Sequence, residues 1–155
     1  MSKHRFNRIL LAVDDTPCTA KAIAYTRDLV EEFESSVALV TVAPPSSPAN
    51  YSDPLLGQQP IIVTEVTEIQ QESAQRYLES LSEEFSGAKE VFLFNKTGNV
   101  RDEILNTATE WTADLIVMGS NGRTGFEHFI SGSVSESVIR KASCPVFVVP
   151  HKCGD

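Results

Sequence analysis

The chain has 155 residues, the usual length of one domain and enough to bury a core. Its 13 basic and 21 acidic side chains give a formal net charge of −8, which excludes the basic surface needed to bind nucleic acid or anionic lipid. An apolar fraction of 41% excludes general disorder. The acidic excess is uneven, because residues 28–110 carry four basic and fifteen acidic side chains, whereas residues 111–155 carry four of each. The last third can therefore best receive an anion.

Targeting and metal-binding patterns are weak in this sequence. The apolar runs are far shorter than the ~20 residues of a membrane span. The basic start leads into a short apolar run that ends at Asp14 without a cleavage site, so we expect no signal peptide. The three cysteines form no C-x-x-C pair and the three histidines share no helical face, which argues against a disulfide framework and a zinc site. We expect a soluble, cytoplasmic protein.

The first half of the chain alternates strands with helices. Continuous apolar runs predict buried strands over 6–13 and 36–43. Between them, Thr16-Pro17 predicts a helix start, with threonine as N-cap and proline at the first helical position. Residues 44–60 are rich in Pro, Asn, Asp and Gly and predict a flexible loop without regular structure. Helical periodicity then returns over 62–85, through apolar residues that include Ile69.

The second half continues the alternation. Its predicted elements are a strand over 90–95, a helix after the N-cap Asn99, a strand over 114–118, a helix over 133–142 with Val134, Val138 and Ile139 facing inward, and a strand over 145–149. Strands that alternate with helices predict right-handed crossovers and a parallel sheet. We therefore predict one doubly wound α/β domain over residues 1–155, with five strands and four helices. Ligands of such sheets bind beyond the carboxyl ends of the strands.

The stretch between the fourth strand and the last helix contains Gly119, Gly122, Gly125 and Gly132. Glycine lets another group approach the backbone closely. Gly132-Ser133 would lie at a helix N-terminus, where unpaired N–H groups and the dipole favour an anion. The spacing is neither that of a Walker A loop nor that of a dinucleotide G-x-G-x-x-G. The sequence thus predicts a phosphate site, with a tight structural loop as the alternative.

The glycine spacing also points to a known family. Gly119-x-x-Gly122, nine residues and then Gly132-Ser133 resembles the nucleotide-binding signature of the universal stress protein (UspA-like) family. The opening 8–14, the string 121–125 and the ending 143–150 look like the same family. The resemblance covers nearly the whole chain apart from 44–60. It implies an adenine-nucleotide alpha-hydrolase-like fold with strand order 3-2-1-4-5, ATP as ligand, and a homodimer through the fifth strand, residues 145–149.

The resemblance implies roles for matching residues around the base and ribose. Asp14 would lie near the ribose and a bound Mg²⁺, and Ala12 and Val13 would flank the base. Val42 would read the adenine edge through its backbone. Met118 and Gly119 would form the floor beneath the ribose.

The phosphate cradle implied by the resemblance consists of Gly122, Gly132, Ser133 and Val134. We add Arg123 for its charge, and Gly98 for its position at the mouth. Two departures from the family pattern stand out: Asp15-Thr16 replaces the more usual Gly-Ser, and Asn121 stands where many relatives have His. The first adds negative charge, which could weaken nucleotide binding or strengthen its dependence on metal.

These expectations favour a stress or signalling protein that binds ATP as a regulatory ligand and acts on an unknown regulatory protein partner. One alternative is a slow Mg²⁺-dependent ATP hydrolase, although His128 is the nearest histidine and no general base is obvious. Another is a dimeric interaction module that binds no nucleotide, in which Asp14-Asp15 merely caps the first helix. A phosphorelay receiver is excluded, because Asn95 ends the predicted third strand and Pro150 follows the fifth, where an Asp and a Lys are required.

Overall fold

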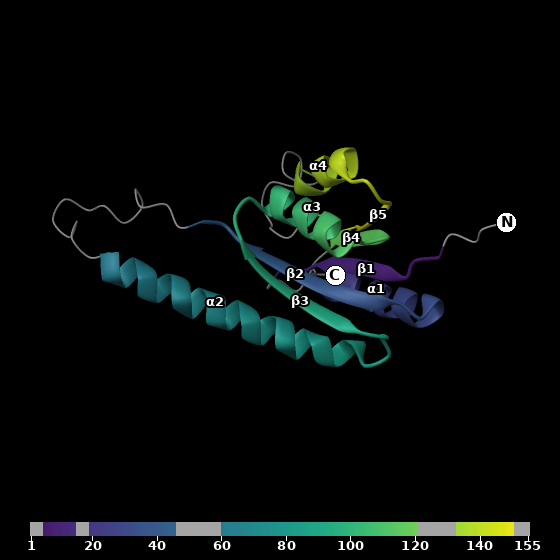
Figure 1. Ribbon diagram of the computed structural model, residues 1–155, viewed down its shortest axis with the longest axis horizontal. Helices are drawn as coiled ribbons and strands as arrows, with labels where there is room; N and C mark the ends of the chain where they lie inside the picture. The colour runs from purple at the N-terminus through teal and green to yellow at the C-terminus, as the bar shows by residue number, and fades with distance from the viewer. Residues whose placement is uncertain (1–4, 15–18, 46–59, 121–132, 151–155) are drawn as a thin grey trace.

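The computed structural model describes residues 5–14, 19–45, 60–120 and 133–150, with only the main chain for 60–67 and 133 (Figure 1). Its elements are β1 (Arg8–Ala12), α1 (Thr19–Phe33), β2 (Ser36–Ala43), α2 (Pro60–Ser82), the 3-10 turn η2 (Glu83–Phe85), β3 (Val91–Thr97), α3 (Val100–Trp111), β4 (Leu115–Gly119), α4 (Ser133–Lys141) and β5 (Val146–Val149). The strands form one parallel sheet in the order β3-β2-β1-β4-β5. The predicted class, strand order and helix number are confirmed.

The sheet separates two apolar layers. Successive side chains of a strand point to opposite faces, so alternate residues of β1 serve different clusters. Ile9 and Leu11 pack with side chains of α1 and α2, whereas Leu10 packs with α3 and α4. Figure 1 shows α3 and α4 on one side of the sheet and α2 on the other. Both faces of β1, β2 and β4 are thereby covered, which explains why these strands are continuous apolar runs.

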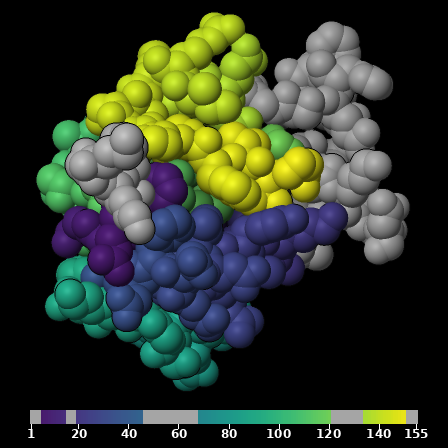
Figure 2. Space-filling model, turned by 90° about the vertical axis from the view of Figure 1, so that its right-hand side faces the viewer, coloured from purple at the N-terminus to yellow at the C-terminus, as the bar shows by residue number. Residues whose placement is uncertain are grey.

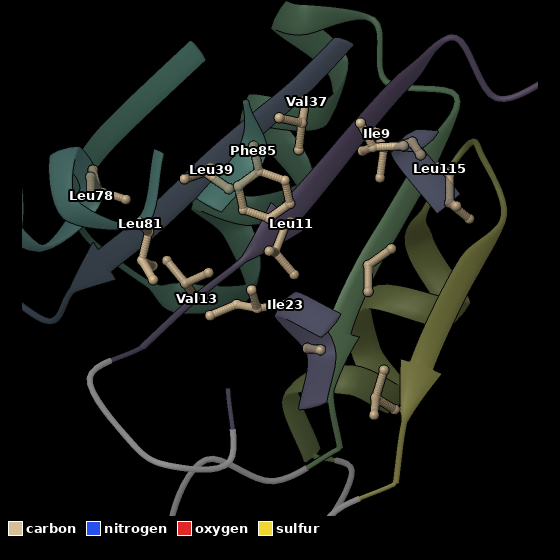
Figure 3. Close-up of a cluster of buried hydrophobic side chains, with 14 residues drawn as sticks. Ile9, Leu11, Val13, Ile23, Val37, Leu39, Leu78, Leu81, Phe85 and Leu115 are labelled. Carbon is tan, nitrogen blue, oxygen red and sulfur yellow. The ribbon is translucent and has the colours of Figure 1, made fainter. Parts of the chain in front are cut away.

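The cluster on the α1 and α2 side centres on Phe85 (Figure 3). The Phe85 ring is only 2% exposed and lies among Val37, Leu39 and Leu11 of β1 and β2. Leu78 and Leu81 of α2 belong to the same cluster. The last turns of α2 and the short η2 turn are therefore fixed against the sheet by burial of large apolar side chains.

Several predicted boundaries need correction. The third strand does not end at Asn95 but continues to Thr97, because it pairs with β2 as far as Ala43↔Thr97. Pro60, assigned to the irregular loop, is the first residue of α2, where its missing N–H has no intrahelical acceptor to lose. The predicted first strand shortens to Arg8–Ala12, although Val13 N still donates to Val40 O at 2.9 Å.

The prediction that Ile139 faces inward is wrong, and Ile69, which belongs to the predicted helical period, is exposed as well. Ile69 is 63% exposed and Ile139 is 53% exposed. In α4, Val138 takes the buried position, so the next residue is rotated by about 100° away from the sheet. The Asn99 cap is confirmed, since its Oδ1 accepts from Asp102 N at 3.1 Å. The predicted Thr16-Pro17 start and residues 46–59 of the loop lie outside the described residues.

Candidate functional site at the carboxyl edge of the sheet

The carboxyl ends of three adjacent strands bring predicted site residues onto one face. β1 lies between β2 and β4 in the sheet. Ala12 ends β1, Val42 lies near the end of β2, and Met118 lies near the end of β4. All three pack with the cluster on the α3 and α4 side, and Val134 from the first turn of α4 joins them. Together they form a largely apolar floor at the edge where ligands of such sheets bind.

Asp14 lies two residues beyond the end of β1 and is exposed. Its carboxylate Oδ1 accepts a hydrogen bond from Thr19 Oγ1 at 2.6 Å, and Thr19 is the first described residue of α1. The main-chain carbonyl of Asp14 accepts from the Tyr77 hydroxyl of α2, also at 2.6 Å. Val13, one residue earlier, points to the opposite face and is buried in the cluster of α1 and α2. The acidic side chain is thus held at the rim of the apolar floor.

Gly119 and Gly98 play different parts at this edge. A Cβ on Gly119 would meet nothing within 4 Å among the described atoms. Among the described residues, therefore, nothing requires a glycine at position 119, and no described atom fills the space above it. Gly98 has a φ of +151°, and a Cβ there would lie 3.0 Å from Glu103 Oε1. The positive φ is the reason that the turn between β3 and α3 favours glycine here, and Gly98 N donates to Ala43 O at 2.9 Å.

The described site is incomplete on the phosphate side. The predicted residues Gly122, Arg123 and Gly132 lie outside the described residues, and for Ser133 only the main chain is described, as the first residue of α4. No group of three metal-ligating side chains occurs among the described residues. Mg²⁺ commonly uses one or two carboxylates together with substrate phosphates, so Asp14 alone suits a metal that arrives with a nucleotide.

Sequence reasoning missed two residues that contact Asp14. Thr19 lies in the predicted first helix, and its nearness to Asp14 in the chain makes the hydrogen bond foreseeable. Tyr77 fits the apolar period of the predicted helix over 62–85. No local pattern indicates its contact with Asp14, because the two residues are 63 positions apart.

Cys144, a cysteine with a raised pKa, lies away from the carboxyl edge of the sheet. Burial raises the pKa of Cys144, and the neighbouring charge of Asp114 raises it further. Asp114 precedes β4 and Cys144 precedes β5, so both belong to the amino edge of the sheet. A raised pKa keeps the thiol protonated near neutral pH, which does not suit a nucleophile.

Comparison with known proteins identifies the family of this chain and supports its fold. The family model described as "Universal stress protein family" matches residues 5–150. The chain belongs to the universal stress protein family. Universal stress protein MJ0531 of Methanocaldococcus jannaschii is 31% identical over 144 residues, which cover 93% of this chain and 82% of that protein. Among the described residues, no helix combines the length and hydropathy that crossing a membrane requires.

Solved structures of this family share the fold. The structure of MJ0577 superposes with a TM-score of 0.79 at 24% identity, covering 96% of this chain and 99% of that one. A universal stress protein in complex with cAMP superposes with a TM-score of 0.68 at 17% identity, covering 96% of this chain and 99% of that one. At these identities the likeness concerns the fold alone.

Proposed function

We propose that this universal stress protein binds ATP, with Mg²⁺, as a regulatory ligand at the carboxyl edge of the sheet. The observation that carries the proposal is the pairing of an exposed carboxylate with an open floor: Asp14 stands at the rim, and nothing described fills the space above Gly119. A polar rim beside an apolar floor is the usual form of a nucleotide pocket. The cAMP complex of a structural neighbour gives independent support for an adenine nucleotide.

Each residue has a defined part in this proposal. Ala12 and Val42, which are half-buried, offer apolar surface to the base and ribose, the buried Met118 supports this surface from the core, and Asp14 offers an oxygen ligand to Mg²⁺. Gly122, Gly132, Ser133 and Val134 surround the phosphates at the N-terminus of α4, with Arg123 nearby. The net charge of zero on residues 111–155 removes general repulsion of the triphosphate. ATP itself supplies most of the ligands of the metal when bound.

ATP titration of the purified protein with and without Mg²⁺ tests this function, together with mass spectrometry of small molecules released on denaturation. We expect co-purified ATP or micromolar affinity, lost in Gly132→Val because a β-branched side chain would occupy the phosphate position. Phosphate release in the same sample separates a slow hydrolase from a binding protein. Absence of binding with and without Mg²⁺ would instead favour a nucleotide-independent module.

We also propose that the protein is a cytoplasmic homodimer formed through β5. A regulatory protein partner would recognise whether the dimer has bound nucleotide. β5 lies at the edge of the sheet and pairs only with β4 among the described strands. Figure 2 shows β5 between α4 and α1 on one face of the molecule. Phe147 of β5 and Tyr25 of α1 are 39% and 50% exposed, with ring centroids 5.8 Å apart. An exposed apolar strand edge is a surface that pairing with a second copy would cover.

Phe147→Glu is expected to raise the dimer dissociation constant at least about tenfold, because it places a charge in the centre of the apolar contact. Ile69→Glu is the matched control, since Ile69 is also exposed but lies on α2. Sedimentation equilibrium measures both. A monomeric wild type, or a Phe147→Glu dimer as tight as the wild type, would rule out the β5 interface.

A further inference from the structure

Within the described part of the chain, hydrogen bonds join the middle of α2 to β3 and to the segment that follows β1. The Tyr77 hydroxyl donates to the Asp14 carbonyl at 2.6 Å, and the Asn95 side-chain amide of β3 donates to the Gln71 carbonyl at 3.0 Å. Both connect the same helix to the carboxyl half of the sheet. They differ in their partners, because the Tyr77 bond reaches Asp14 of the candidate site, whereas the Asn95 bond joins α2 to β3 away from that site.

These bonds lie where α2 changes from exposed to buried. Leu78, Leu81 and the following Phe85 are buried, whereas residues 68–73 are all exposed. Figure 1 shows the amino-terminal part of α2 extending beyond the carboxyl ends of β2 and β3. Tyr77 lies one residue before the first of these buried leucines. A displacement of the projecting part of α2 would therefore move the Asp14 carbonyl through its hydrogen bond with Tyr77.

Asp14 is held by hydrogen bonds from two helices, to Thr19 of α1 and to Tyr77 of α2. Thr19 Oγ1 of α1 lies 2.6 Å from the carboxylate and 3.0 Å from the carbonyl of Asp14. A threonine hydroxyl has one proton, and the shorter contact places it on the carboxylate. The Tyr77 hydroxyl then supplies the donor for the carbonyl. Together the two contacts set both the position of the main chain and the direction of the carboxylate.

We propose that Tyr77 is a positioning residue of the Mg²⁺–nucleotide site, which acts by holding the Asp14 carbonyl and thereby couples α2 to metal-dependent nucleotide binding. The inference rests on the proposed function, since it assigns the regulation of that same site. Coupling between two sites is reciprocal. Bound Mg²⁺–ATP must therefore strengthen the attachment of α2, just as that attachment strengthens the binding.

The variant Tyr77→Phe tests this with little disturbance of packing. The Tyr77 ring packs against the cluster of α1 and α2, and phenylalanine keeps that ring while removing the donor. Asn95→Ala is the matched control, because it removes the other α2 bond without touching Asp14. In the ligand-free protein we expect faster amide hydrogen exchange at Asp14 and Thr19 in Tyr77→Phe and not in Asn95→Ala. This readout needs no nucleotide, so it stands even if the proposed function fails.

The binding readout is the Mg²⁺ concentration that half-saturates ATP binding. We expect it to rise about three- to tenfold in Tyr77→Phe, the value of one neutral hydrogen bond, and to stay unchanged in Asn95→Ala. Mg²⁺–ATP should slow amide exchange in α2 around Tyr77 in the wild type and do so less in Tyr77→Phe. An equal rise in both variants would mean that α2 merely needs attachment to the sheet, which overturns the positioning role.

A double-mutant cycle with Asp14→Asn tests whether Tyr77→Phe weakens Mg²⁺-dependent ATP binding by way of the Asp14 carboxylate. If Tyr77 acts by positioning Asp14, Tyr77→Phe should add little to the loss that Asp14→Asn already causes. An undiminished further loss in the Asp14→Asn background would overturn the inference. A wild type that binds no ATP at any Mg²⁺ concentration would refute the proposed function, and unchanged exchange at Asp14 in Tyr77→Phe would refute the contact itself.

Discussion

Gly119→Val is expected to weaken ATP binding roughly 10- to 100-fold without loss of stability. The Cβ of residue 119 would meet nothing within 4 Å in the described protein, and Gly119 does not have the positive φ that disfavours other residues. The new side chain would therefore fit the free protein. It would occupy the floor on which we place the ribose, so that its cost appears only when the nucleotide binds. Isothermal titration calorimetry and urea unfolding measure the two quantities.

Two controls sharpen this prediction. Gly119→Ala should have a smaller effect on affinity, because it adds one methyl group. Gly98→Val should reduce the free energy of unfolding, since Gly98 has a φ of +151° and its Cβ would crowd Glu103. ATP affinity equal to that of the wild type in a folded Gly119→Val protein would show that the ligand does not lie over β4. A Gly119→Val protein that fails to fold would contradict the open space itself.

Phe85→Ala is expected to reduce the free energy of unfolding by about 3–5 kcal/mol. Phe85 is 2% exposed and central to the cluster shown in Figure 3, so truncation leaves a cavity between α2 and the sheet. Urea unfolding followed by circular dichroism measures the change. Phe147→Ala is the matched control at low protein concentration, since Phe147 is 39% exposed and should lose about 1 kcal/mol or less.

The outcome of the Phe85 experiment also bears on the site. If the cavity loosens the last turns of α2, the Tyr77–Asp14 contact should weaken with it, and Mg²⁺-dependent binding should decline in the surviving folded fraction. A loss below about 1 kcal/mol would mean that the surrounding side chains collapse around the missing ring. The attachment of α2 would then depend on Leu78 and Leu81.

Local patterns determined much of the fold. The run 36–43 is apolar apart from Ser36 and Thr41 and forms β2 with the predicted bounds, because a strand buried on both faces is nearly continuously apolar. Asn99 caps α3 as predicted, because the cap depends on its own side chain and the next three residues. The position of Asp14, Val42, Met118 and Gly119 at one edge followed from their places at strand ends in a parallel sheet.

Other features depended on partners distant in the chain. Lys96 and Thr97 are polar and give no strand pattern, yet they belong to β3 because they pair with Val42 and Ala43 of β2. Ile69 and Ile139 fit a helical period, but each lies where no layer covers its helix face. A period in the sequence shows that a helix has an apolar stripe, and only the packed neighbours decide how far that stripe is buried.

The sequence by itself thus determined the alternation of strands and helices, the family and the edge of the sheet that holds the candidate site. Those properties are encoded within single segments, as hydrophobic period, caps and glycine spacing. The tertiary structure alone decided that Tyr77 holds Asp14 in place. Tyr77 meets the Asp14 carbonyl because α2 packs against β3 and β2, and a contact between residues 63 positions apart leaves no local pattern in either segment.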